Sequence, residues 1–161
     1  MILKASQRGG GQDLAAHLMK MEDNEHVDLH ELRGFATDTL KGALKEAEAV
    51  SRGTQCRQYL FSLSLSPPEQ ASVAPDVFER AIDRIEERLG LEGQPRAIVF
   101  HEKDGRRHAH CVWSRICAQL FGDSECASDL AVADVKSLPS TTDAETQSNG
   151  TGAGKGRNRN E

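Results

Sequence analysis

The stretch Ala97-Ile98-Val99-Phe100-His101-Glu102-Lys103-Asp104-Gly105-Arg106-Arg107-His108-Ala109-His110 decides the fold. Its Asp104-Gly105 pair separates two strand-sized runs, and an Asp-Gly pair in that position predicts a tight β-hairpin. His108 and His110 are two residues apart, so on a strand both side chains point to the same face. The hairpin brings His101, at the end of the first run, beside that pair. The stretch therefore predicts two antiparallel strands that gather three imidazoles on one face.

Three imidazoles without a fourth protein ligand nearby are typical of a catalytic metal site that keeps open positions. A lone His-x-His pair is more often an ordinary surface or core feature. The third histidine and the hairpin make metal ligation the favoured interpretation, and the neighbouring Arg106 and Arg107 are suited to holding a phosphate. We predict that His101, His108 and His110 bind a divalent metal ion.

The remaining sequence alternates helical and strand patterns. Apolar residues at helical spacing predict helices over residues 12–21, 37–50 and 75–89, and alternation predicts strands over residues 26–32 and 59–64. Strands that alternate with helices and end in a hairpin predict an α+β fold with a mainly antiparallel sheet and the helices packed on one face.

A change of composition marks the end of this pattern. Residues 137–161 are rich in Ser, Thr, Asn and Gly and contain no aromatic residue. Such a segment buries too little apolar surface to fold alone. We therefore expect one folded domain over residues 1–117 and a polar, mostly disordered tail over residues 118–161.

The net charge of −5 excludes a strongly basic nucleic-acid-binding domain. Residues 1–117 hold 16 basic and 18 acidic residues, so any DNA binding has to use local cations and the charge of a metal ion. No apolar run is long enough to cross a membrane, and the N-terminus lacks the apolar core of a signal peptide. The four cysteines show no framework spacing, which favours reduced thiols. We expect a cytoplasmic protein without a membrane partner.

The run His101–Ile116 resembles the metal-binding motif of plasmid relaxases, the mobilisation nucleases of the HUH endonuclease class. Gln58–Pro68 is similar to the strand of that family that ends in Ser and Pro, and Asp76–Leu91 resembles the helix that follows it. Leu14–Lys20 resembles the helix that carries the nucleophile. The resemblance covers roughly residues 1–116.

This resemblance implies an α+β nuclease that nicks single-stranded DNA at a transfer origin by transesterification. It implies a divalent ion, Mn²⁺, Mg²⁺ or Zn²⁺, and accessory mobilisation proteins as further partners. Members of the family usually continue past the metal strand with helices that close over the DNA. The polar tail stands in that place here, so we expect a truncated relaxase domain that is incomplete at its C-terminal end.

The resemblance also implies a nucleophile in the first helix, usually a tyrosine. The single tyrosine of this chain, Tyr59, lies on a predicted strand, and His17 stands at the matching helical position. Some relaxases of the wider class use histidine and form a phosphoramidate. His17 is therefore the nucleophile candidate and Tyr59 the fallback, expected to be buried among helices on the far face of the sheet. Glu102 is the candidate for orienting a ligand histidine.

We further expect five DNA-binding side chains: Ser62, Ser64, Lys103, Arg106 and Arg107. Two other hypotheses stay open. An HUH-like DNA-binding module that no longer cleaves, or an inactive relaxase fragment, is favoured by the absence of a tyrosine in the first helix. A metal-binding fragment with no role on DNA is favoured by the acidic net charge.

Overall fold

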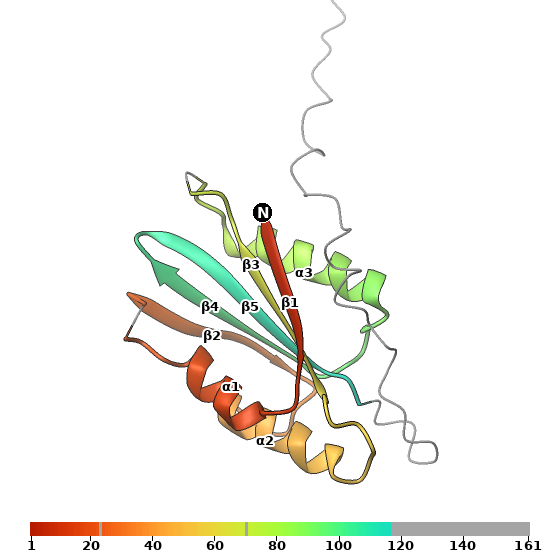
Figure 1. Cartoon of the computed structure of the whole chain (residues 1–161). Coiled ribbons are helices and arrows are strands. Elements are labelled where there is room, and N and C mark those ends of the chain that lie inside the picture. Colours follow the sequence, from red (N-terminus) through yellow and green to blue (C-terminus); the bar gives the residue numbers. More distant parts are fainter. Residues whose placement is uncertain (23, 70, 117–161) are drawn as a thin grey trace, which may run out of the picture.

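The computed structural model describes residues 1–22, 24–69 and 71–116, which form a five-stranded antiparallel sheet with three helices (Figure 1). The elements in chain order are β1 (Ile2–Arg8), α1 (Gly11–Leu18), β2 (His26–Arg33), α2 (Leu40–Ser51), β3 (Leu60–Ser66), α3 (Pro75–Leu89), β4 (Arg96–Lys103) and β5 (Arg106–Ser114). The strands lie in the order β1-β3-β5-β4-β2. The predicted α+β class with an antiparallel sheet is confirmed, and the predicted tail lies outside the described residues.

Strands β4 and β5 form the predicted hairpin. Its turn residues Asp104 and Gly105 have φ angles of +53° and +67°. Positive φ at both central positions is the geometry of a two-residue turn whose twist matches that of the strands it joins. In the resulting register His101 lies opposite His108, and Val99 lies opposite His110.

Helices cover both faces of the sheet, so the expectation that they pack on one face is wrong. Helix α3 packs on one side, with Phe78 and Ile82 in a cluster that includes Trp113. Helices α1 and α2 pack on the other side in a cluster that includes Leu14 and Val112. The reason lies in β4, where residues 97–100 are all buried. Because consecutive strand residues point to opposite faces, an unbroken apolar run needs cover on both.

A buried ion-pair network fastens α3 to the sheet. Glu86 is 6% exposed and Arg96 is 5% exposed. The Glu86 carboxylate accepts hydrogen bonds from Arg96 at 2.7 Å, from Arg33 at 2.7 Å and from the Trp113 indole at 2.8 Å. Arg96 also donates two hydrogen bonds to Glu31, at 3.2 and 2.8 Å. The network joins α3 to β2, β4 and β5 in the interior, where an unpaired charge is costly.

The helix boundaries lie close to those predicted, with recognisable caps. The Thr39 hydroxyl accepts a hydrogen bond from the Gly42 amide at the start of α2, and Gly90, at φ +63°, ends α3. Among the described cysteines Cys111 is a free, buried thiol, whereas Cys56 is disulfide-bonded, so the expectation of reduced thiols is wrong for Cys56. Within the described part of the chain no helix has the length and apolar character needed to span a membrane.

Candidate functional site

One end of the sheet is left uncovered on the side where α1 and α2 pack. We call this side the histidine face, because His101, His108 and His110 point to it, and we call the opposite side the α3 face. Strand β3 shows the difference clearly. Leu63 and Leu65 are completely buried in the α3 cluster, whereas the serines that alternate with them are only partly buried: Ser62, Ser64 and Ser66. The histidine face therefore presents a strip of hydroxyls beside the imidazoles.

The three histidines lie together on the histidine face. His101 and His108 are direct cross-strand partners, and the ring centroids of His101 and His110 are 4.4 Å apart. His101 is 7% exposed, and the other two are partly buried. In the described ranges, however, no three His, Cys, Asp or Glu side chains are arranged around a common point that could hold a metal ion. The imidazoles are clustered, and metal ligation by them stays a prediction.

Hydrogen bonds hold two of the three rings. His101 Nε2 lies 2.6 Å from the carbonyl oxygen of Leu18, and His108 Nδ1 lies 3.1 Å from the Ser66 hydroxyl. The Leu18 carbonyl belongs to the end of α1, where helical carbonyls lack intrahelical partners. If His101 donates from Nε2, its Nδ1 keeps a lone pair. Metal-binding histidines are commonly oriented in this way, through their second nitrogen.

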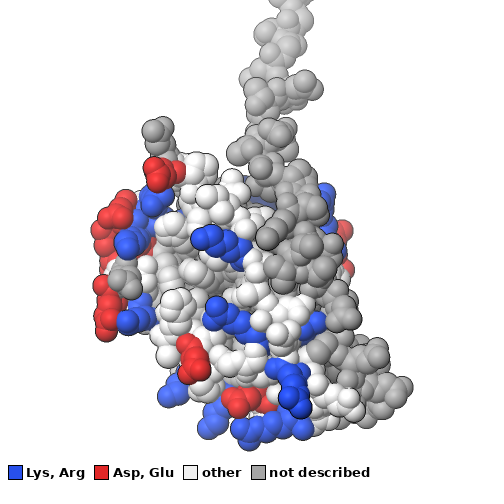
Figure 2. Space-filling model, in the orientation of Figure 1, with Lys and Arg blue, Asp and Glu red and all other residues white. Residues whose placement is uncertain are grey.

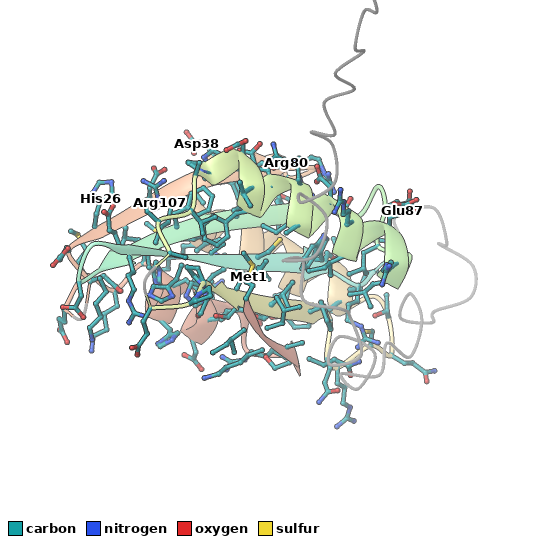
Figure 3. All side chains as sticks on the ribbon, turned by 90° about the horizontal axis from the view of Figure 1, so that it is seen from above. Met1, His26, Asp38, Arg80, Glu87 and Arg107 are labelled. Atoms are coloured by element: carbon teal, nitrogen blue, oxygen red, sulfur yellow. The ribbon has the colours of Figure 1, made fainter. Side chains whose placement is uncertain are left out.

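The orienting role expected of Glu102 does not fit its position. Glu102 follows His101 directly in β4, so its side chain points to the α3 face, where its carboxylate lies 3.9 Å from Arg107. Arg107 lies on the α3 face as well, with its guanidinium carbon 5.7 Å from the centre of the Phe100 ring. Figure 3 shows Arg107 beside His26 on the side of the sheet that α3 covers. Neither Glu102 nor Arg107 therefore faces the three histidines, which leaves Leu18 and Ser66 as the orienting groups that the sequence did not indicate.

All three imidazoles favour the neutral form. Burial lowers the pKa of His101 and of His108, and the positive charges of Arg106 and Lys103 lower the pKa of His108 further. Burial, followed by the charges of the neighbouring histidines, lowers the pKa of His110 to about 4. Neutral imidazole is the form that binds metal ions, so the lowered pKa values are compatible with the predicted ligation at neutral pH.

His17 lies at the edge of this cluster. It is exposed near the end of α1 and directly precedes Leu18, whose carbonyl oxygen contacts His101. After burial, the charge of His17 is among the causes that lower the pKa of His101 and of His110, so the His17 ring is within electrostatic range of both.

Tyr59 lies elsewhere, beneath α1. It is 3% exposed, and its hydroxyl oxygen accepts a hydrogen bond from the Gly11 amide at 3.1 Å. Burial raises its pKa, and its charged neighbours are Glu48 and Arg52 rather than the histidines. Tyr59 belongs to the cluster of α1 and α2, so the expectation that it lies on the far face is wrong. The reason is that Tyr59 precedes the first residue of β3 and does not follow the alternation of that strand.

Charges are distributed unequally between the two faces. The described strands carry three carboxylates, Asp28, Glu31 and Glu102, and all three lie on the α3 face, beside Arg107 or Arg96. The predicted DNA-binding cations Lys103 and Arg106 lie on the histidine face, where both act on the pKa of His108. In Figure 2 isolated Lys and Arg side chains lie across a largely uncharged centre of the visible face, and many of the acidic side chains gather at its left edge. The histidine face thus suits an anionic ligand.

The family model described as the nuclease domain of MobA/VirD2-like relaxases matches residues 13–124. The matched range begins within α1, at Asp13, and includes His17 and the hairpin that carries the three histidines. No curated protein matches the chain.

Proposed function

We propose, from the premise that the chain belongs to the MobA/VirD2-like relaxase nuclease family, that it nicks single-stranded DNA at a transfer origin during plasmid mobilisation. The family implies a DNA substrate and a strand-nicking enzyme. One observation carries the finer proposal: His101, His108 and His110 share the histidine face, with His17 at their edge. Accessory mobilisation proteins are further partners that the family suggests.

The chemistry of the donor set supports binding of the divalent ion that is typical of this family. Three neutral imidazoles lie together, and carbonyl and hydroxyl groups orient two of them. We propose His101, His108 and His110 as the residues that would hold the ion, which would polarise the scissile phosphate when bound there. Imidazole ligands suit Mn²⁺ and Zn²⁺ better than Mg²⁺.

We assign the nucleophile to His17. A neutral imidazole nitrogen of His17 attacks the phosphorus, the bond between phosphorus and the 3′ oxygen breaks, and the leaving oxygen takes up a proton to become a 3′ hydroxyl. The 5′ phosphate then stays joined to His17 as a phosphoramidate. Ser62, Ser64, Lys103 and Arg106 hold the neighbouring DNA, since hydroxyls and cations are the usual partners of phosphate oxygens.

The test is adduct formation with single-stranded transfer-origin DNA and Mn²⁺, resolved on a denaturing gel. Wild-type protein is expected to form an acid-labile covalent adduct. His17→Ala is expected to abolish the adduct while it leaves DNA binding intact, and Tyr59→Phe serves as the matched control that retains it. An adduct that survives His17→Ala but not Tyr59→Phe passes the assignment to Tyr59.

A second candidate is an HUH-like module that binds DNA and does not cleave it. The observation in its favour is that the described residues show no assembled ligand set, and that the single tyrosine is buried under α1. This candidate is the right one if DNA binds to the histidine face and no adduct forms with Mn²⁺, Mg²⁺ or Zn²⁺.

A further inference from the structure

Edge strand β1 extends the histidine face beyond the histidines. Leu3 and Ala5 pack against the α3 cluster, so the residues that alternate with them, Lys4 and Ser6, lie on the histidine face. Lys4 is exposed and pairs in register with Ser64, which in turn pairs with His110. A straight row across three strands therefore runs from His110 through Ser64 to Lys4.

Lys4 has no counter-ion in the part of the chain that the structure describes. Its partner on β3 is Ser64, and its neighbours on the same face of β1 are Ser6 and the exposed Ile2. The carboxylates of the strands lie on the α3 face, which is screened from Lys4 by the sheet. An unpaired lysine beside serine hydroxyls, on a face where the described strands carry no carboxylate, is suited to binding a phosphate of a nucleic-acid backbone.

The distance between Lys4 and His110 is comparable to the distance between phosphates one or two nucleotides apart in a single strand. Adjacent strands lie about 4.8 Å apart, so the backbone of Lys4 lies about 10 Å from that of His110. The long, flexible stem of lysine carries its ammonium group over part of that span. A phosphate close to the one held at the histidines therefore comes within reach of Lys4.

We propose that β1 is part of the DNA-binding surface, and that Lys4 binds a backbone phosphate of the single strand close to the scissile position, so that the strand leaves the histidines across β3 toward the β1 edge. The inference rests on the proposed function for the identity of the ligand. Lys4 is a positioning residue, because it acts on the path of the strand and does not touch the reacting atoms.

The test measures binding of the full chain to fluorescent single-stranded oligothymidylate by anisotropy, in EDTA and over a range of NaCl concentrations. EDTA removes metal-dependent cleavage from the measurement. Loss of one phosphate contact is expected to lower the slope of log affinity against log salt by about 0.7, and to weaken binding several-fold at low salt. Lys4→Ala is expected to show this loss, and Lys4→Arg, which keeps the charge, is expected to retain the wild-type slope. Lys45→Ala, at an exposed lysine of α2, is the matched control.

The outcomes separate the inference from the proposed function. A salt slope of Lys4→Ala equal to that of Lys45→Ala overturns the role of Lys4, even where wild-type protein forms the DNA adduct. Wild-type protein that does not bind oligothymidylate overturns it as well. If binding depends on Lys4 but no adduct forms, the role of Lys4 is supported and only the nicking activity is contradicted.

Discussion

The two faces of the sheet are formed by the same five strands, and they carry opposite chemistry. On the α3 face, carboxylates and arginines are paired, and Glu86 and Arg96 are both almost fully buried. On the histidine face, imidazoles, serines and cations lie beside one another without a strand carboxylate among the described residues. The difference shows that net charge describes this chain poorly. This acidic protein presents a surface that suits an anion because the carboxylates of its described strands all lie on the α3 face.

Substitutions on the two faces of the sheet are expected to have different effects on stability and on ligand binding. Substitutions on the α3 face are expected to change the free energy of unfolding and to leave ligand binding by the folded protein unchanged. Substitutions on the uncovered part of the histidine face are expected to do the reverse.

The largest expected effect is on the α3 face. Glu86→Ala removes a carboxylate that accepts hydrogen bonds from Arg96, Arg33 and Trp113, and it leaves the buried guanidinium of Arg96 with fewer counter-charges. Breaking such a buried pair is expected to lower the free energy of unfolding by about 3 kcal/mol. Urea denaturation measures the change.

Glu87→Ala is the matched control for this experiment, since Glu87 is the exposed neighbour of Glu86 on α3. It is expected to change stability by no more than about 0.5 kcal/mol. If Glu86→Ala lowers the free energy of unfolding by less than about 1 kcal/mol, the ion pairs of the α3 face do not make the expected contribution to stability.

The next effect concerns the metal site. His108→Ala removes one of the three proposed ligands, and the affinity for Mn²⁺ or Zn²⁺ measured by calorimetry is expected to fall by more than about 100-fold, beyond the usual loss for an outer partner of a ligand. The free energy of unfolding is expected to change by less than about 1 kcal/mol, because His108 is only partly buried. His26→Ala, on the α3 face, is the control. If His108→Ala and His26→Ala bind the metal ion with equal affinity, His108 is not one of its ligands.

A smaller effect is expected at Ser66. Its hydroxyl lies 3.1 Å from His108 Nδ1, and Ser66→Ala removes that orienting contact. Outer partners of this kind contribute about tenfold or more to metal affinity. Ser62→Ala, four residues away on the same face, is expected to leave metal affinity unchanged. Calorimetry of the two variants decides whether Ser66 orients the ring or only lies near it.

The last and smallest expected effect concerns the reactivity of the Cys111 thiol, on the α3 face. Burial raises the pKa of its thiol well above the ordinary value, so the thiolate fraction at about pH 8 is lower in the folded protein than in the unfolded chain. Alkylation of Cys111, followed by mass spectrometry, is expected to proceed in urea and not in the native protein. Labelling of the native protein at a similar rate shows that the α3 face opens.

The parts of this fold that the sequence predicts are those encoded locally. Asp104-Gly105 fixes the hairpin through turn chemistry, and the spacing of His108 and His110 places both on one face. The same alternation places Glu102 and Arg107 on the opposite face from the histidines, so the alternation of side chains along each strand is enough to exclude them from the site. They were predicted as site residues because they are close to the histidines in the sequence, but the strand turns their side chains the other way.

The remaining features depend on contacts between distant segments. The Leu18 carbonyl that holds His101 lies 83 residues away in the chain, and a backbone group has no signature in the sequence. Lys4 reaches the histidine face only through the pairing of β1 with β3. The placement of Tyr59 under α1 follows from its position just before β3, at a strand boundary that periodicity locates only approximately.

We propose that DNA cleavage takes place on the histidine face, with His17 as the nucleophile. The most direct measurement is peptide mapping by mass spectrometry of the covalent product formed with single-stranded transfer-origin DNA and Mn²⁺, under conditions that preserve phosphoramidates. We expect a nucleotide attached to His17, with a free 3′ hydroxyl on the released strand. A nucleotide attached to Tyr59, or DNA that stays intact while bound to the protein, contradicts it.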